Sequence, residues 1–307
     1  MHSISIVIPA YNEEGNIPKI SDKIIKTLKS TQLNYEIMFI DDGSTDNSWS
    51  IIKSLTQEYE VIKAIKFSRN FGHDIAIKAG LDHSNADITI VMDSDLQHPP
   101  EIILSIIDSI KKDDCDIVLM KRTFNKGKSI FRSFINKIYY KLFSAFTKIK
   151  LEEGISDFFA VNKKVLRVLK NIHQKNIFIR GVLQIIGFRK KIIEYQANER
   201  HSGKSKYNFR SLLSLSKKSF IGFTYLPLRI TEIFGLLLSF LSFLYGFYSI
   251  IKTLLIGSIS GWASTITTIS FLNGFILLLL AFYIEYFIVA MDELKETPQY
   301  IIEEENE

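Results

Sequence analysis

Two aspartates one residue apart follow an apolar stretch that has the composition of a buried strand. The stretch ends at Met92 and leads into Asp93 and Asp95. In an extended strand, residues i and i+2 project from the same face, so both carboxylates would point to one place where the strand leaves the sheet. Converging carboxylates repel each other unless a cation lies between them, and hard oxygen ligands suit Mg²⁺ or Mn²⁺. The pattern therefore predicts a divalent-metal site, with an acidic turn before the helix that Pro99 and Pro100 start as the alternative.

The segments around this stretch alternate between strand and helix patterns. Strands are expected at 3–10, 35–42, 61–68, 88–93 and 116–122, and helices at 13–30, from Trp49 onward, at 74–84 and at 100–112. Apolar strands that alternate with helices indicate an α/β fold with a mostly parallel sheet and helices on both faces. Ligands of such sheets bind beyond the carboxyl ends of the strands. Polar clusters at 9–13, 41–44 and 93–95 follow three of the strands, so we expect a ligand site at this edge.

Two long apolar segments lie near the carboxyl end of the chain. Residues 233–251 and 253–284 contain no charged side chain. A membrane-spanning helix needs about 20 such residues. We therefore expect two transmembrane helices within 230–291, with a buried core helix as the alternative. Basic residues are concentrated before the first segment and the chain begins without a signal peptide, so we expect a multi-pass protein of the inner (plasma) membrane with a cytoplasmic catalytic part.

The composition excludes several classes of protein. The single cysteine, Cys115, rules out a disulfide framework and a cysteine-rich zinc site. The net charge of +5 comes without the interleaved basic and aromatic side chains that favour binding of nucleic acid. The sequence has no G-x-G-x-x-G motif, and neither GKS triplet has the upstream glycine of a P-loop. His73, His98 and His201 do not have the spacing of metal ligands, so we expect them to be surface or loop residues.

Four motifs occur in a fixed order along the chain. They are PAYNEE at 9–14, IDDGSTD at 40–46, MDSDLQHPPE at 92–101 and ERHSGKSKY at 199–207. Together they resemble the family 2 glycosyltransferases, which have the Rossmann-like GT-A fold. Within that family the chain is most similar to the polyprenyl-phosphate glycosyltransferases, which include dolichol-phosphate mannose synthases and bacterial bactoprenol glucosyltransferases. The resemblance covers residues 3 to about 230, and the two apolar segments fit the layout of the bacterial branch.

The resemblance implies a donor site at the ends of the strands. Contacts with the nucleotide sugar are expected from five residues: Pro9, Tyr11, Glu13, Asp42 and Asp93. Asp93, Asp95 and Gln97 would hold Mg²⁺ or Mn²⁺ against the diphosphate of the donor, where the metal neutralises the charge on the departing nucleotide. For Pro9 and Tyr11, packing within a turn is the alternative interpretation.

The resemblance also implies an acceptor side. Basic residues at phosphate-binding positions of the family are Arg122, Arg132, Arg200 and Lys206, for which a solvated basic face is the alternative. Asp157 aligns with an acidic residue that is often assigned as the catalytic base in related transferases. Asp157 is therefore one expected catalytic residue, and Asp95 of the D-x-D motif is the other. A phosphate acceptor is already ionised near neutral pH, and we therefore expect Asp157 to position it. Phe159 stands where bacterial relatives typically carry an arginine, which is a departure on this side.

The chain is expected to divide into four regions. Residues 1–206 would form the catalytic domain, 207–229 an interfacial amphipathic region, 230–291 the two transmembrane helices, and 292–307 a cytoplasmic acidic tail. A second amphipathic stretch at 129–147 is also expected to lie in the membrane interface, with an ordinary core helix as the alternative.

The expected activity is the inverting transfer of a hexose from a nucleotide sugar to polyprenyl (undecaprenyl) phosphate. UDP-glucose is the favoured donor, and GDP-mannose or another UDP-sugar is the alternative. Two other classes remain open, namely a non-catalytic scaffold that binds nucleotide sugars and a transferase that acts on a protein or a glycan. The expected partners are the donor, the lipid acceptor and the membrane, without nucleic acid. The oligomeric state is left open, with a homo-oligomer as one option.

Overall fold

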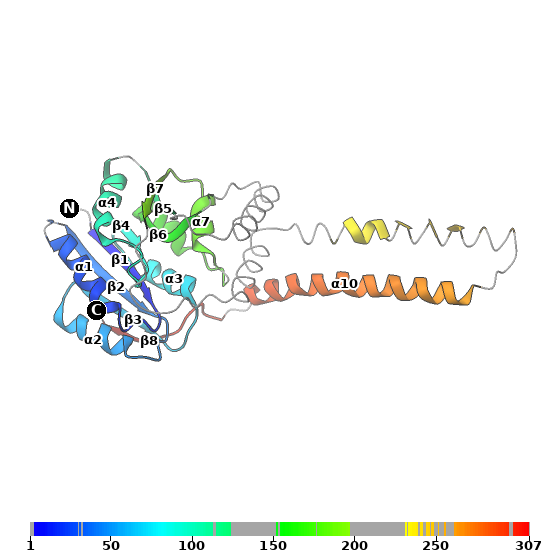
Figure 1. Ribbon diagram of the computed structural model, residues 1–307, viewed down its shortest axis with the longest axis horizontal. Helices are drawn as coiled ribbons and strands as arrows, with labels where there is room; N and C mark the ends of the chain where they lie inside the picture. Colours follow the sequence, from blue (N-terminus) through cyan, green and yellow to red (C-terminus); the bar gives the residue numbers. More distant parts are fainter. Residues whose placement is uncertain are drawn as a thin grey trace. The chain divides into compact units, whose positions relative to one another are not determined.

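The computed structural model divides the chain into two compact units (Figure 1). The first unit comprises Met1–Phe209 with Thr297–Glu307, and the second comprises Arg210–Glu296. The structure describes residues 3–29, 31, 33–112, 115–123, 152, 154–175, 177–196, 231, 233–238, 240–241, 244–245, 247–248, 251, 255, 261–294 and 297–306.

An eight-stranded sheet forms the centre of the first unit, with the order β7-β5-β6-β4-β1-β2-β3-β8. The strands are β1 (Ser3–Ala10), β2 (Asn34–Asp41), β3 (Ile62–Phe67), β4 (Ile88–Val91), β5 (Ile117–Thr123), β6 (Ile155–Asn162), β7 (Lys190–Gln196) and β8 (Ile302–Asn306). β6 and β8 run antiparallel to their neighbours, whereas every other pairing is parallel. The predicted mostly parallel sheet is therefore confirmed, and β6, β7 and β8 are additions to the predicted strands.

Helices cover both faces of this sheet (Figure 1). They are α1 (Ile17–Lys29), α2 (Ser48–Glu58), α3 (His73–His83), the 3-10 turn η1 (Pro100–Ile102) with α4 (Ile103–Lys112), α6 (Lys163–Lys170) and α7 (Ile179–Ile185). Alternate residues of β1, such as Ile6, pack in one apolar core with α1, α2 and α4. On the opposite face α3 packs tightly on β1, because a Cβ added at Gly80 would lie 2.1 Å from Cγ1 of Val7. The first helix was predicted from residue 13 but begins at Ile17, after a turn.

The last residues of the chain form an edge strand of the sheet. β8 pairs antiparallel with β3, and Nε1 of Trp49 donates a hydrogen bond to Oε2 of Glu304 at 2.9 Å. The ring of Tyr300 stacks on that of Phe67, with 5.2 Å between the ring centroids. The Tyr300 hydroxyl also donates to Oδ2 of Asp82 at 3.3 Å. Within the segment predicted as an acidic tail, 292–307, residues 302–306 form this strand and 292–294 end the helix α10 (Trp262–Leu294).

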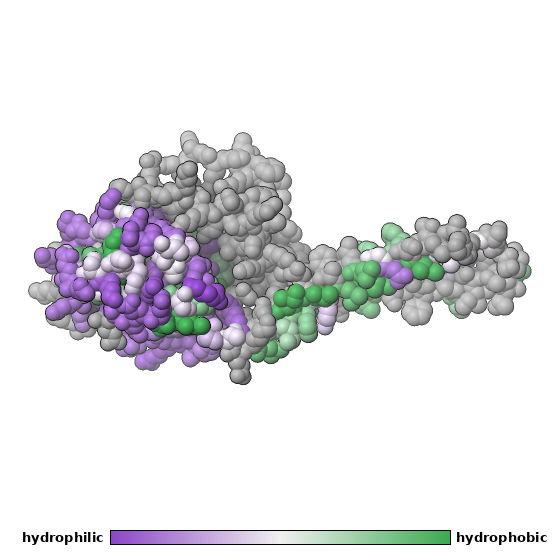
Figure 2. Space-filling model, turned by 90° about the horizontal axis from the view of Figure 1, so that it is seen from below, coloured by the Kyte–Doolittle hydropathy of each residue, from purple (hydrophilic) through white to green (hydrophobic). Residues whose placement is uncertain are grey.

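In the second unit, the long helix α10 covers Trp262–Leu294. Its exposed apolar side chains include Phe271 and Leu277, and Figure 2 shows apolar residues on the surface of the described part of this unit. None of the helices in the described residues is both long and apolar enough to cross a membrane, so the prediction of two transmembrane helices is not supported. The predicted interfacial stretches at 129–147 and 207–229 lie outside the described residues.

Gly43 brings the turn after β2 against the chain that follows β3. Its φ is +67°, and an added Cβ would lie 2.4 Å from the carbonyl carbon of Arg69. Gly187 has a similar φ of +77° but no atom within 4 Å of such a Cβ. We expect Gly187→Ala to cost about 1 kcal/mol of unfolding free energy through backbone strain alone. Gly43→Ala should cost about 1–3 kcal/mol more, because the backbone at Arg69 must shift.

Urea unfolding of the two purified variants, followed by circular dichroism, compares these costs directly. Equal losses of unfolding free energy in both variants would show that the contact between the two loops contributes nothing to stability.

Candidate active site

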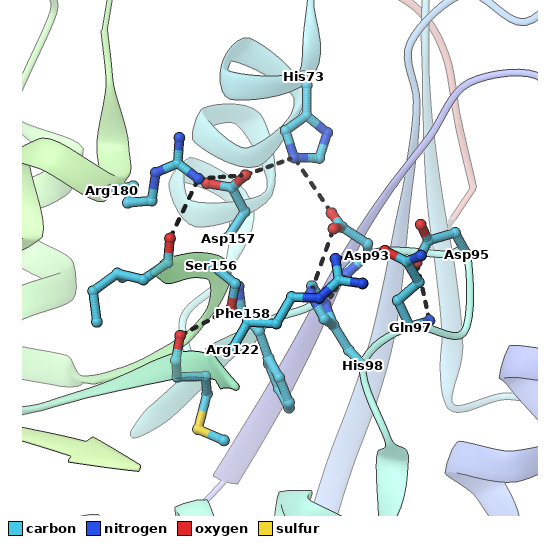
Figure 3. Close-up of polar contacts among 12 residues, drawn as sticks. His73, Asp93, Asp95, Gln97, His98, Arg122, Ser156, Asp157, Phe158 and Arg180 are labelled. Atoms are coloured by element: carbon cyan, nitrogen blue, oxygen red, sulfur yellow. Dashed lines mark hydrogen bonds and ion pairs between the residues drawn. The ribbon is translucent and has the colours of Figure 1, made fainter. Parts of the chain in front are cut away.

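The three polar clusters expected at one sheet edge do meet there. Ala10 pairs with Asp41 at the ends of β1 and β2, and the N–H of Asp42 donates to the carbonyl of Ala10. On the other side of β1, β4 ends at Val91, which pairs with Phe159 of the antiparallel β6. Because β6 enters the sheet from this edge, its first residues lie beside the loop that follows β4 (Figure 3).

The two aspartates of the D-x-D motif belong to a loop beyond the strand. β4 ends at Val91, and Leu96 has a φ of +63° within the turn that follows. Asp95 is 6% exposed, and its Oδ1 accepts a hydrogen bond from the N–H of Gln97 at 3.1 Å. The expectation that Asp93 and Asp95 project from one face of an extended strand is therefore wrong. The turn itself brings these aspartates and Gln97 into one loop (Figure 3).

The buried side chain of His98 holds this loop in place. It is 4% exposed, and its Nδ1 accepts a hydrogen bond from the backbone N–H of Asp93 at 2.9 Å. An Nδ1 that accepts leaves the proton on Nε2, which lies 3.6 Å from Oδ2 of Asp93. The ring also stacks on Phe158, with centroids 4.8 Å apart. The expectation of a surface or loop histidine is wrong in one respect, since His98 lies in a loop but is buried and supports the site.

The loop has ligand atoms that suit a hard divalent cation. Oδ1 of Asp93 is buried and makes no hydrogen bond. Oε1 of Gln97 accepts a hydrogen bond from Nη1 of Arg122 at 3.1 Å, which places that cation beside the loop. Among the described residues, no group of three or more His, Cys, Asp or Glu side chains is arranged to hold a metal. Mg²⁺ is usually bound by one or two carboxylates together with substrate phosphates, so these residues fit a metal that a bound diphosphate would complete.

His73 and Arg180 connect this loop to Asp157 (Figure 3). Nε2 of His73, the first residue of α3, lies 3.4 Å from Oδ1 of Asp93 and 4.0 Å from Oδ2 of Asp157. Nη1 of Arg180 lies 3.6 Å from the same Oδ2. The N–H of Ile179 also donates to Asp74, which joins the beginnings of α3 and α7. Carboxylates and cations thus alternate from Asp93 to Arg180.

The charges of this cluster shift the pKa values of its members. Burial would raise the pKa of Asp157, but the charges of Arg180 and His73 outweigh it and hold the pKa below its usual value. Burial would likewise lower the pKa of His73, yet the carboxylates of Asp93, Asp157 and Asp74 raise it above its usual value. Asp157 is therefore ionised at neutral pH and is a weak base.

The residues expected to contact the nucleotide lie at the ends of β1 and β2. Pro9 is buried, whereas Tyr11 and Glu13 are partly exposed. Oε2 of Glu13 accepts a hydrogen bond from Nδ2 of Asn16 at 2.6 Å. Asp42 is 3% exposed. Its carboxylate accepts from the N–H groups at 71 and 72, at 2.6 Å and 3.0 Å, so in this conformation it holds the loop before α3.

Comparison with known protein families identifies the family of this chain. The model of the family described as "Glycosyl transferase family 2" matches residues 5–169, which is more than half of the chain. The chain belongs to glycosyl transferase family 2. It is 36% identical over 300 residues to the uncharacterized glycosyltransferase YkcC of Bacillus subtilis (strain 168), covering 97% of this chain and 93% of that protein. It is 34% identical over 305 residues to the bactoprenol glucosyl transferase of Shigella phage SfV, covering 99% of both chains.

Solved structures share the fold of this family 2 enzyme. The mannosyl-3-phosphoglycerate synthase of Rubrobacter xylanophilus has a TM-score of 0.51 at 15% identity and covers 71% of both chains. A glucosyl-3-phosphoglycerate synthase of Mycobacterium tuberculosis, solved with Mn²⁺, UDP and phosphoglyceric acid, has a TM-score of 0.50 at 17% identity. It covers 70% of this chain and 75% of that one. These likenesses support the GT-A-like α/β fold.

The structure unites only some of the expected site residues of this glycosyltransferase. Four of them lie close to one another or to shared partners, namely Asp93, Gln97, Arg122 and Asp157. Three others lie outside the described residues, namely Arg132, Arg200 and Lys206. Sequence reasoning did not identify His73, Asp74, His98 or Arg180 as site residues. For the first two a signal was present, because 69–74 follow β3 and so reach the same sheet edge as the other polar clusters.

Burial of the Asp42 carboxyl predicts a pH dependence of stability that can be measured. Burial raises the pKa of this carboxyl to about 6, although the N–H groups of Phe71 and Gly72 act in the opposite direction. The folded protein then binds a proton more tightly than the unfolded chain, so the ionised carboxyl lowers stability as pH rises from about 4 to 6. Asp42→Asn removes that loss. We expect the unfolding free energy of the variant, relative to wild type, to increase across this pH range.

Asp116→Asn is the matched control at the opposite sheet edge. Burial would raise the pKa of Asp116, but hydrogen bonds from Asn162 and Arg189 outweigh it and lower the pKa. This variant should therefore lose stability relative to wild type at neutral pH, and the gap should close as the pH falls below about 4. Urea unfolding at several pH values measures both trends, and parallel trends for the two variants would refute the assignment of Asp42.

Proposed function

We propose that this enzyme transfers a hexose from a nucleoside diphosphate sugar, with UDP-glucose as the first candidate, to a polyprenyl phosphate such as undecaprenyl phosphate. The observation that carries the proposal is the position of Asp157 and its cations beside the D-x-D loop, because donor and acceptor sites must meet at the reacting carbon. Relatives named bactoprenol glucosyl transferase, alike over nearly the whole chain, support a lipid phosphate as the acceptor. Inversion at the sugar carbon is part of the proposal.

The donor would be bound at the D-x-D loop. Asp93, Asp95 and Gln97 would hold Mg²⁺ or Mn²⁺, which would neutralise the charge that develops on the departing nucleoside diphosphate. Arg122 is placed to assist, because its guanidinium already contacts Gln97. Pro9, Tyr11, Glu13 and the loop that Asp42 supports would then form the nucleotide side of the site.

On the acceptor side, orienting the phosphate matters more than removing a proton from it. The second pKa of a phosphate monoester is about 6, so much of the acceptor is already a dianion at neutral pH. The lowered pKa of Asp157 makes it a poor base in any case. We therefore assign Asp157 to positioning, which alone can contribute large factors to a rate.

The location of the enzyme follows from this acceptor. A polyprenyl chain keeps its phosphate at a membrane surface, so the first unit would act at the cytoplasmic face of the plasma membrane. The basic residues of 200–229, which precede the apolar segments, suit a surface of anionic lipids.

Incubation of membranes that contain the full chain with radiolabelled UDP- and GDP-sugars tests the proposal. Organic extraction separates lipid-linked label from protein-linked and glycan-linked label. A labelled lipid that mild acid hydrolyses would identify the donor and support the acceptor class. Label in protein or glycan, or none in any fraction from an intact chain, would reject it.

The metal role predicts that Asp93→Asn and Asp95→Asn lose at least about a hundredfold in turnover, because each removes a carboxylate ligand. Asp108→Asn is the control, since Asp108 is an exposed aspartate of α4 that pairs with Lys112. Activity should also disappear in excess EDTA and return with Mg²⁺ or Mn²⁺. Full turnover in EDTA would contradict the metal role.

The positioning role predicts the pH dependence of Asp157→Asn. Turnover at a subsaturating concentration of acceptor should fall strongly, and raising the pH should not restore it, because the acceptor already lacks the proton in question. The measurement is a pH profile of turnover between pH 6 and about 9, the range above the second pKa of the acceptor phosphate. Recovery of the rate at alkaline pH would show that Asp157 acts as a base.

A further inference from the structure

Arg180 lies at the acceptor side of the site without belonging to any of the four motifs. It is the second residue of α7, and its Nη1 donates to the carbonyl of Ile155 at 3.4 Å and lies 3.6 Å from Oδ2 of Asp157. Both contacts are with the first residues of β6. They fix the guanidinium beside the entry of that strand, while 28% of the side chain stays open to solvent.

The charges around Asp157 pose a problem for an anionic acceptor. Asp93 and Asp157 lie within 4.0 Å of the same His73 imidazole, and Asp74 adds a third carboxylate nearby. A phosphate that approached these carboxylates alone would be repelled by them. It therefore needs a cation on the Asp157 side in addition to the one that Arg122 provides at Gln97.

We infer that Arg180 binds the phosphate of the acceptor and that Asp157 acts mainly by holding its guanidinium in place. The inference rests on the proposed function, which it deepens. A guanidinium carries donors on more than one edge, so it can pair with a carboxylate and a phosphate at the same time. Arg122 then serves the donor diphosphate, Arg180 serves the acceptor phosphate, and Asp157 positions the acceptor through Arg180.

This assignment explains why an aspartate with a weakly basic carboxylate is placed here. An ion pair limits the rotamers of a long side chain, so the donors are in position before the ligand arrives. The pair of Arg189 with Asp116, with Nε 3.4 Å from Oδ2, offers a comparison. It joins the same two residue types at the opposite edge of the sheet, beside the start of β5 and away from the D-x-D loop.

The test compares Arg180→Ala and Arg180→Lys with Arg189→Ala in the full chain. With farnesyl phosphate as acceptor, Arg180→Ala should raise the acceptor KM by at least about tenfold, because charge-assisted contacts with phosphate are among the stronger hydrogen bonds. The donor KM should change less than about threefold. The acceptor KM of Arg180→Lys should lie between those of wild type and Arg180→Ala, because lysine keeps the charge and fills most of the same space. Arg189→Ala should leave both constants unchanged. A loss of kcat with an unchanged acceptor KM, or behaviour like that of Arg189→Ala, would overturn the inference.

Binding of farnesyl phosphate without donor, measured by calorimetry, separates this inference from the proposed function. If wild type binds farnesyl phosphate tightly and both Arg180 variants bind it more weakly, the role of Arg180 is supported. If that pattern is seen but no sugar is transferred, only the proposed function is rejected. Transfer by wild type with equal binding by wild type and both Arg180 variants would reject the inference alone. No binding to wild type, together with no transfer, would overturn both.

Discussion

The antiparallel insertion of β6 beside β4 is the constraint on which the site depends. Strands that run in one direction bring their carboxyl ends to one edge, and β6 instead presents its first residues there. Asp157 therefore reaches the loop of Asp93 although 64 positions separate them in the sequence. The second helix after β6, α7, places Arg180 against the start of the same strand. A small change in this pairing register would separate the acceptor side from the donor side.

The charges at the site determine which ligands this geometry can accept. Carboxylates gathered in a small volume are stable only when cations lie beside them, and His73 and Arg180 take those places, while Arg122 contacts Gln97. The same arrangement suits a reaction between two anions, because each anion meets a cation where it enters. In the proposed reaction the carboxylates would hold those cations and a metal in place, which is a different use from taking a proton.

Much of the fold was predictable because the strands on either side of β1 are apolar runs bounded by turn residues. β6 and β7 mix polar and apolar positions, and β8 consists mainly of glutamates, so their strand character comes from pairing partners that are distant in sequence. Within the site, the D-x-D motif pointed to Asp93 and Gln97, and the resemblance to the family pointed to Asp157. His73 and Arg180 belong to helix starts that tertiary packing brings together, and the burial of His98 depends on its stacking with Phe158.

The position of β8 has a consequence for biosynthesis. The last strand of the first unit leaves the ribosome only after the whole of the second unit has been made. Until then β3 is an open edge with the ring of Phe67 uncovered, and an unpaired apolar edge is a template for aggregation. A chain terminated before β8 would keep that edge open. The nascent protein thus reaches its finished sheet in a single late step, when Tyr300 and the glutamates that follow it close over β3.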